Sequence, residues 1–368
     1  MHRQVGSIVL VLVFQAAAFA QRGEPLEVIC PVDGYHFRIP VGERGDRNGG
    51  KDSDECPHDR RGQTLPHMLM VCPRCNYAAS SREFLKSLTD EERLRVLHAL
   101  ASSEYRGVAN SLTEIPGWER FRLAAMCAEV LKKEQEQLEY LEFAAWSARV
   151  EACRPASVAY SSPARKITPL GQRISEWEVT RPIADVIREI KEEMKGAKKP
   201  REKHRLMLHL AMMYERAGFA AERDKVLGQL EKSAESGSLL TRRVSRFRNL
   251  VAVETDFQKQ VVALAQERLA KLEARWERAT TNYLIADTLR RLGKDAEAVK
   301  HYRAARKLLT RPSETRIYVD HFLSMLAPGE PLPTPEPEEE EKAEKTPATP
   351  PQFTTEPPEV PKQDSPKE

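Results

Sequence analysis

Two short cysteine motifs near the N-terminus constrain the fold of this chain more than any other feature. Residues 72–77 read Cys-Pro-Arg-Cys-Asn-Tyr and repeat the pattern of residues 30–35, Cys-Pro-Val-Asp-Gly-Tyr, in which an aspartate replaces the second cysteine. Two thiolates separated by two residues can bind one tetrahedral metal from a single tight turn. The residue after the second ligand position turns the chain sharply, often at positive φ. Glycine and asparagine are the least strained residues there, and Gly34 and Asn76 occupy this position in the two motifs. The two motifs together therefore predict a zinc-ribbon-like site.

The sequence leaves the fourth ligand of this site open. Three sulfurs are available from the two turns, and Asp33 stands where the fourth is expected. Cys56 lies on the segment between the turns and could restore four thiolates. Structural zinc sites prefer cysteine and histidine to a carboxylate, which disfavours Asp33. Because Cys56 would restore four sulfurs, we favour it also over a nearby histidine (His36, His58 or His67). The predicted metal ligands are therefore Cys30, Cys56, Cys72 and Cys75. A closed site of this kind is structural and not catalytic.

The N-terminus has the pattern of a signal peptide. Two basic positions, His2 and Arg3, precede an apolar run over residues 5–14, and residues 18–20 read Ala-Phe-Ala, a small-x-small cleavage site. We expect residues 1–20 to be removed and the mature protein to be exported to a periplasm-like or extracellular space, without a membrane span. An uncleaved anchor is the alternative, although the apolar stretch is short for a span of about 20 residues.

Export makes disulfides an alternative to zinc. The six cysteines could pair in an oxidising space, for example Cys30 with Cys56, or Cys127 with Cys153 if their helices form a hairpin. Cys127 is more simply a packed core residue, because its neighbours are apolar and helical in pattern. A third possibility is thiol–disulfide exchange or metal handling through Cys72 and Cys75, since Cys-x-x-Cys also occurs in redox proteins.

The composition indicates a mainly α protein. Charged residues make up 31% and aromatic residues 7% of the 368, which is typical of soluble helical chains. The 58 basic and 55 acidic residues nearly cancel, a balance that argues neither for nor against nucleic acid, and we expect no nucleic-acid partner. The sequence contains no glycine-rich phosphate loop, His-Glu-x-x-His pair or Gly-x-Ser-x-Gly elbow, and we expect no enzymatic activity. A hydrolase that uses Asp52, Asp54 and His58 is a remote alternative, because clustered acids of this kind usually form a solvated loop.

The pattern along the chain divides it into regions. A capping box at Thr89 and Glu92 begins the helices, which we expect at residues 118–132 and 134–151. Prolines then interrupt the pattern, and a proline- and glutamate-rich end is expected to be disordered. The predicted regions are a zinc-ribbon-like β head at 24–86, helical hairpins at 87–153, a loop at 154–179, helical repeats at 180–326 and a disordered tail at 327–368.

Part of the third region resembles a tetratricopeptide repeat. Over residues 281–309, small residues such as Ala286 and Ala298 alternate with larger ones on two helices joined at Gly293. An earlier copy at residues 206–230 matches only in its first helix, because Arg223 occupies a position that usually takes a small residue. Such repeats imply stacked helical hairpins that bind a protein or peptide partner.

The N-terminal part as a whole resembles an uncharacterised bacterial family of unknown function. The resemblance covers residues 27–152 and rests on the first turn, on Asp-Ser-Asp at residues 52–54, on Val-Cys-Pro-Arg-Cys-Asn-Tyr-Ala at 71–78 and on the helical residues 144–149. It implies a double-turn head followed by helices and no known activity. Together these patterns predict an exported, non-catalytic adaptor with a structural zinc.

Overall fold

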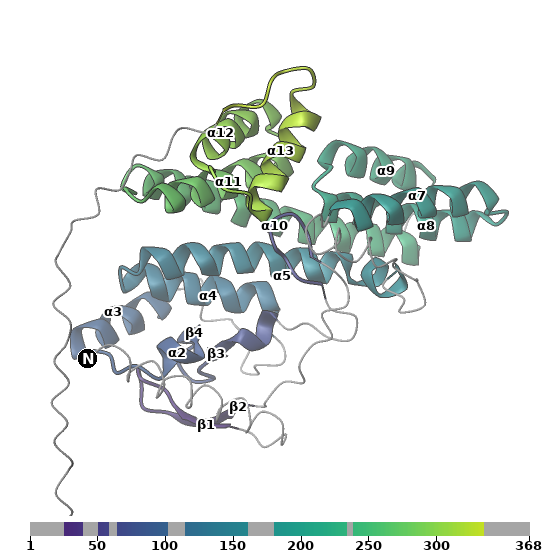
Figure 1. Cartoon of the computed structure of the whole chain (residues 1–368). Helices are drawn as coiled ribbons and strands as arrows, with labels where there is room; N and C mark the ends of the chain where they lie inside the picture. The colour runs from purple at the N-terminus through teal and green to yellow at the C-terminus, as the bar shows by residue number, and fades with distance from the viewer. Residues whose placement is uncertain are drawn as a thin grey trace, which may run out of the picture.

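The described part of the chain comprises residues 26–39, 51–58, 65–101, 115–160, 180–233 and 238–334 of a computed structural model. The predicted signal peptide at 1–20 and most of the predicted loop (154–179) and tail (327–368) lie outside these residues. What is described is a mainly α protein with two small two-stranded sheets, as the sequence predicts (Figure 1).

The head consists of two antiparallel β-hairpins, each with one cysteine motif at its tip. Strand β1 (Leu26–Ile29) pairs with β2 (His36–Ile39), and β3 (Leu69–Val71) pairs with β4 (Ala78–Ser80). The two hairpins form separate sheets. Both hairpins have the succession strand, turn and strand, which agrees with the predicted small β head. A 3-10 helix, η1 (Leu65–Met68), leads into β3, and the short helix α2 (Ser81–Phe84) follows β4.

Helices make up most of the rest of the described chain, and we call α4 to α13 the body. Helix α3 (Asp90–Leu100) begins at Thr89, whose side chain and that of Glu92 form the predicted capping box. The body helices are α4 (Gly117–Val130), α5 (Glu134–Tyr160), α7 (Thr180–Gly196), α8 (Pro200–Ala217), α9 (Ala220–Ser233), α10 (Leu239–Leu269), α11 (Arg275–Arg291), α12 (Asp295–Leu308) and α13 (Glu314–Leu326). Over the described ranges, no helix is both long enough and apolar enough to cross a membrane.

Two sequence expectations about these helices are wrong. Helix α5 does not end at the expected residue 151 but continues through Pro155 to Tyr160. Proline removes one backbone hydrogen bond, which a long helix packed along two neighbours can tolerate near its end. The second helix of the earlier repeat copy, which Arg223 argues against, forms as α9. The Arg223 side chain is 11% exposed, and its guanidinium is compensated by ion pairs with Glu215 and Asp224.

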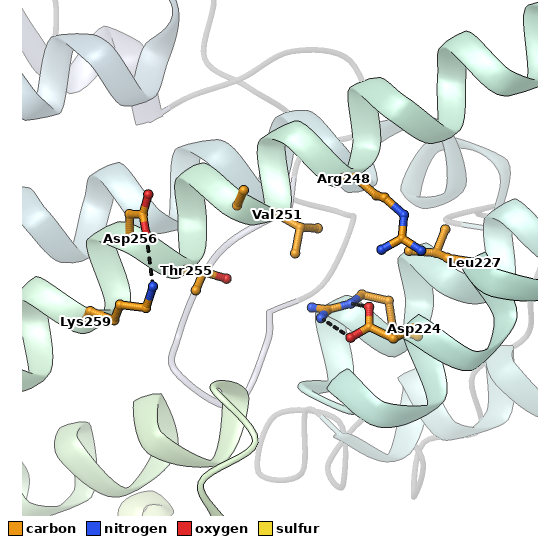
Figure 2. Close-up of a pocket in the computed structure, with 9 residues that line it drawn as sticks. Asp224, Leu227, Arg248, Val251, Thr255, Asp256 and Lys259 are labelled. Atoms are coloured by element: carbon orange, nitrogen blue, oxygen red, sulfur yellow. Dashed lines mark hydrogen bonds and ion pairs between the residues drawn. The ribbon is translucent and has the colours of Figure 1, made fainter. Parts of the chain in front are cut away.

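The 31-residue helix α10 connects the parts of the body. In Figure 1 it lies between the α4–α5 pair and the α11–α13 group, with α7, α8 and α9 gathered at one end. Helices α9 and α10 leave an open pocket of about 330 Å³ between them (Figure 2). Its charged side chains are bound within the chain, since Arg223 pairs with Asp224, Arg248 with Glu231 and Lys259 with Asp256. The pocket therefore presents no unbalanced charge that would indicate a particular ligand.

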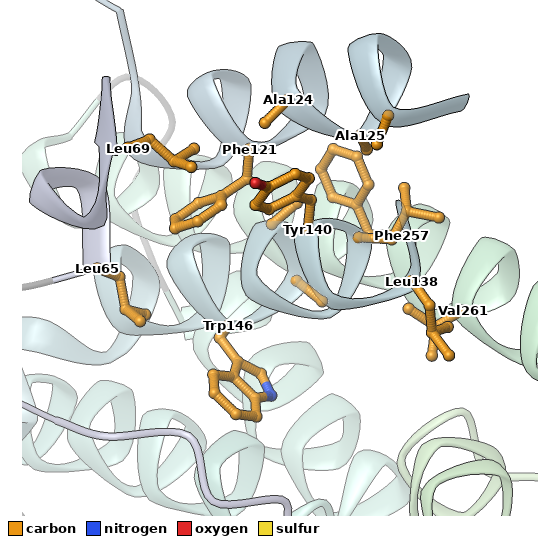
Figure 3. Close-up of a cluster of buried hydrophobic side chains, with 14 of the residues drawn as sticks. Leu65, Leu69, Phe121, Ala124, Ala125, Leu138, Tyr140, Trp146, Phe257 and Val261 are labelled. Atoms are coloured by element: carbon orange, nitrogen blue, oxygen red, sulfur yellow. The ribbon is translucent and has the colours of Figure 1, made fainter. Parts of the chain in front are cut away.

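One hydrophobic core joins the head to the body. Figure 3 shows its centre, which draws Leu65 and Leu69 from the head, Phe121, Ala124 and Ala125 from α4, Leu138, Tyr140 and Trp146 from α5, and Phe257 and Val261 from α10. The same core continues into α11, α12 and α13, while α7, α8 and α9 enclose a second one together with the C-terminal part of α5 and the N-terminal part of α10. The predicted boundary at 86 therefore does not separate two packed units, whereas near 153 the chain passes from the first core to the second. Local sequence patterns could not reveal this, because the contacts join residues far apart in the chain.

Candidate functional site

The two cysteine turns of the head have the same backbone hydrogen bonds. In the first, Cys30 N donates to the carbonyl of Tyr35 at 2.9 Å, and Gly34 N donates to the carbonyl of Cys30 at 2.9 Å. In the second, the amides of residues 72 and 76 donate to the carbonyls of residues 77 and 72, both at 2.9 Å. Gly34 has φ 68° and Asn76 has φ 64°, as predicted for the position after the second ligand. The first turn thus keeps its backbone although its second cysteine is an aspartate.

The turns bring three sulfurs and one carboxylate together. One ligand atom from each of Cys30, Asp33, Cys72 and Cys75 lies within 4.8 Å of all the others. The sulfurs of Cys30 and Cys75 are 3.6 Å apart, and the sulfur of Cys72 lies 3.7 Å from Asp33 Oδ1. A tetrahedral zinc with bonds of about 2.0–2.3 Å separates its ligand atoms by roughly 3.5–3.8 Å. The cluster therefore has the donor types and the spacing of a metal site.

The surroundings of the cluster favour bound negative charge. Arg74 Nε lies 3.8 Å from Asp33 Oδ2, and Arg93 of α3 donates to the carbonyl of Val32 at 3.0 Å, which fixes the first turn against a helix. Hydrogen bonds from the thiols of Cys30 and Cys75 lower the pKa of Cys72 far below that of an ordinary thiol. The contact with Cys72 in turn raises the pKa of Cys30. The direction of the Cys72 shift favours a thiolate at this position, the form of cysteine that binds metals.

The structure does not place Cys56, our preferred fourth ligand, beside the other three cysteines. Cys56 belongs to a different group, with Asp52 and His58, and Asp33 occupies the fourth position beside the three sulfurs. The reason is the path of the segment that carries Cys56, which enters the body instead of returning to the turns. All six cysteines are free, so neither Cys30 with Cys56 nor Cys127 with Cys153 forms a disulfide. Cys127 is a buried core residue, as its pattern predicts.

The segment from Lys51 to His58, which we call the acidic loop, lies among the helices of the body and apart from the β-hairpins (Figure 1). It forms a small closed turn, in which Asp52 N donates to the carbonyl of Cys56 at 3.0 Å and Glu55 adopts φ 66°. The side chains of Asp52, Cys56 and His58 are at most 1% exposed. Our interpretation of these residues as a solvated loop is therefore wrong.

Arginines from several helices bind the acidic loop. Asp52 Oδ1 accepts from Arg216 Nε at 3.0 Å, and its Oδ2 accepts from Arg149 at 3.1 Å and lies 2.8 Å from His58 Nε2. Burial alone would raise the pKa of Asp52, but His58, Arg216 and Arg149 together lower it below its usual range. Asp54 lies 2.8 Å from Arg149 and 3.3 Å from Arg291, and accepts from the Trp146 indole at 3.1 Å.

The backbone and hydroxyl of Ser53, between the two aspartates, are bound by α11. Its hydroxyl donates to Asp287 at 3.1 Å and accepts from Arg290 and Arg291, each at 3.0 Å. Its carbonyl accepts from the Tyr283 hydroxyl at 2.6 Å. Both acids and the serine between them are thus fully engaged within the protein.

The group of Asp52, Cys56 and His58 is poorly suited to metal or catalytic chemistry. Both carboxylate oxygens of Asp52 are bound by arginine, and a cation there would face Arg149 and Arg216 at close range. Cys56 Sγ lies 3.9 Å from His58 Nε2, the same nitrogen that Asp52 contacts. A proton relay needs a different ring nitrogen for each partner. Burial and Arg216 lower the pKa of His58 to about 4, so its ring is neutral near pH 7.

The arginines of this network were missed in the sequence. Arg149 stands in an otherwise apolar helical stretch, and Arg290 and Arg291 end a helix whose inner face carries Asp287. Charged residues at core positions are a usable signal, because they are almost never fully buried unless they are paired. The sequence could not indicate which acids they pair with.

Fold and site together define a mainly α protein with a small β head that carries a possible metal cluster of three thiols and one carboxylate. Within it, residues 26–153 match a bacterial family described as "Uncharacterized protein conserved in bacteria (DUF2225)", which confirms the resemblance seen in the sequence. No curated protein matches the chain, and no solved structure matches it.

Proposed function

We propose that this chain is an exported, non-catalytic adaptor whose head is held together by a structural zinc and whose helical body binds a protein or peptide. The observation that carries the proposal is the cluster of Cys30, Asp33, Cys72 and Cys75, whose ligand atoms lie within 4.8 Å of one another at the tips of two hairpins. A metal there would join two sheets that share no hydrogen-bonded strands. Such a staple suits a small β head with few large apolar side chains.

The body supports the scaffold part of the proposal. Its α8–α9 and α11–α12 pairs are helical hairpins with a glycine at each turn, Gly218 and Gly293, both at positive φ. Together with their resemblance to tetratricopeptide repeats, they favour a surface that binds a protein or peptide. The clustered acids and histidine that a hydrolase would need are bound internally, which favours a non-catalytic role.

The alternative is a thiol–disulfide or metal-handling protein that uses Cys72 and Cys75. Its specific support is that the two residues share one Cys-x-x-Cys turn, in which Cys72 is buried with a lowered pKa and Cys75 is partly exposed with a raised pKa. In this alternative the same residues would cycle between dithiol and disulfide, and the metal would be absent or exchangeable.

Metal analysis and thiol counting on the full-length protein from its native compartment separate the two. The adaptor should hold one zinc per chain, which Cys72→Ser removes and the matched change Cys127→Ser, at a buried cysteine outside the cluster, leaves in place. Zinc retained by Cys72→Ser would contradict the site. Protein without zinc whose Cys72 and Cys75 interconvert between dithiol and disulfide would establish the alternative.

The binding role is tested separately with a photocrosslinking amino acid in the full chain. One variant carries it at Trp276 of the body, which is 58% exposed, and the control carries it at Leu85 of the head, which is 70% exposed. A single reproducible crosslinked partner from the body position is the expected result. The same products from both positions, or none from the body, would contradict binding through the helical face near Trp276.

A further inference from the structure

The acidic loop is bound in the way that a protein binds a peptide ligand. Its Asp-Ser-Asp sequence meets four arginines, one each from α5 and α8 and two from α11. Arg149 bridges the two aspartates, with 3.1 Å to Asp52 and 2.8 Å to Asp54. Charge-assisted hydrogen bonds of this kind are about twice as strong as neutral ones and specify geometry as well as charge.

We propose that the body contains a binding site for a peptide loop with two carboxylates one residue apart, and that the chain's own residues 51–58 occupy this site and fasten the head to the body. The inference goes beyond the adaptor role, and it depends neither on the metal nor on an external partner.

The body itself orients the arginines of this site. Arg290 and Arg291 are held by Asp287, with distances of 2.8 and 2.9 Å, and both also donate to backbone carbonyls at the end of α8. Arg149 is held by Glu254 of α10 at 2.7 Å. Gly218 permits this close approach, because a Cβ there would lie 2.5 Å from Arg290. The loop therefore enters a site whose donors other parts of the body already position.

The charge balance shows why the site needs an acidic occupant. The four arginines face Asp52 and Asp54 from the loop, and Glu254 and Asp287 from the body. Without the loop, all four buried arginines would remain while two of the carboxylates that they bind would be lost. Unbalanced buried charge is strongly unfavourable, so an empty site should bind a peptide that restores the two carboxylates.

The loop is also a compact ligand in its own right. Lys51 and Pro57 form an isolated antiparallel bridge, and Glu55 N donates to the carbonyl of Asp52 at 3.0 Å. The two ends of the turn are thus joined without help from the body. A peptide of residues 51–58 carries all of these contacts, which makes binding in trans possible.

The test empties the site in the full-length chain and supplies the loop as a peptide. The variant Asp52→Lys/Asp54→Lys, which we call the loop variant, places lysines opposite the arginines and should release the loop. The control variant Asp185→Lys/Asp256→Lys makes the same charge change at exposed helical positions. The peptides are residues 51–58 and the same sequence with asparagine at positions 52 and 54, under reducing conditions.

Residues 51–58 should raise the melting temperature of the loop variant in proportion to binding, by mass action, and should leave the wild type and the control unchanged. The asparagine peptide should bind at least about tenfold more weakly, because it lacks the two charge-assisted contacts. A folded loop variant that gains nothing from either peptide overturns the proposal, and so does equal stabilisation by both.

If the variant is recovered unfolded, the peptides are added during refolding. Recovery of helical protein with the acidic peptide alone supports the site, and recovery with neither overturns it.

Discussion

Replacing Arg149 by methionine should be among the most destabilising single changes in this protein. Its guanidinium is 1% exposed and lies 3.1 Å from Asp52, 2.8 Å from Asp54 and 2.7 Å from Glu254. Methionine preserves much of the volume but leaves three buried carboxylates without their shared cation. Breaking a buried ion pair by removal of one partner costs about 3–5 kcal/mol, because the remaining charge is uncompensated.

The remaining partners place the expected loss near the lower end of this range. Asp52 keeps Arg216 at 3.0 Å, and Asp54 keeps Arg291 at 3.3 Å. Glu254 keeps the amide of Gln258 at 2.7 Å, which is neutral. One carboxylate of the three is then poorly compensated, so we expect the free energy of unfolding to fall by about 3 kcal/mol.

Urea unfolding followed by circular dichroism measures this loss, with Arg246→Met as the matched control. Arg246 makes a pair of similar length, 2.8 Å to Glu151, but its side chain is 71% exposed. Exposed pairs contribute about 0–1 kcal/mol, so the control should lie close to the wild type. If the two variants are equally stable, the buried network does not contribute as argued, and the reasoning from charge balance fails with it.

Three further predictions use other parts of the structure. The pKa of His58 is about 4 in the fold and 6.5 as a free side chain, so its contribution to the free energy of unfolding is complete above pH 6.5 and about 3 kcal/mol of it should be lost as the pH falls to 4. His58→Gln should flatten this part of a profile of unfolding free energy against pH. An unchanged slope would exclude His58 as the source of the pH dependence. Gly218→Ala should destabilise the protein by about 1–3 kcal/mol in thermal unfolding, because residue 218 has φ 72° and a Cβ there would contact Arg290. The control Gly228→Ala, in open space on α9, should stabilise it by about 0.5–1 kcal/mol. A Gly218→Ala variant as stable as the wild type would show that the Arg290 side chain moves freely. Asp33→Cys should slow the loss of zinc to a chelator by restoring a fourth sulfur, and loss as fast as in the wild type would mean that this position does not contact the metal.

Local features of the chain were predicted well from the sequence. The two turns, the residues at positive φ after them and the capping box at Thr89 depend on a few neighbouring residues, so their patterns are sufficient to predict them. The ends of helices were less certain. Helix α5 passes through Pro155 because its packing against α4 and α10 outweighs one lost hydrogen bond.

Contacts between distant segments were not predictable in the same way. The choice between Asp33 and Cys56 as neighbour of the three sulfurs depended on where the acidic loop runs, and that path is set by arginines more than 90 residues away in the sequence. The solvated interpretation of Asp52 failed for the same reason. A buried acid and a surface acid look alike in a sequence until the partner is known.

The contact between Ser53 and Asp287 spans 234 positions of the chain, and this has a consequence for the order of folding. A chain that leaves a ribosome or a translocation pore from its N-terminus exposes the acidic loop long before α11 emerges. The hairpins of the head and the α4–α5 pair can form early, since their contacts are local, but the loop can reach its final place only when α11 is complete. Contacts of such long range slow folding, because the entropy of closing the intervening chain is lost first. The last step of folding should therefore be the closure of the body around a segment synthesised near its beginning.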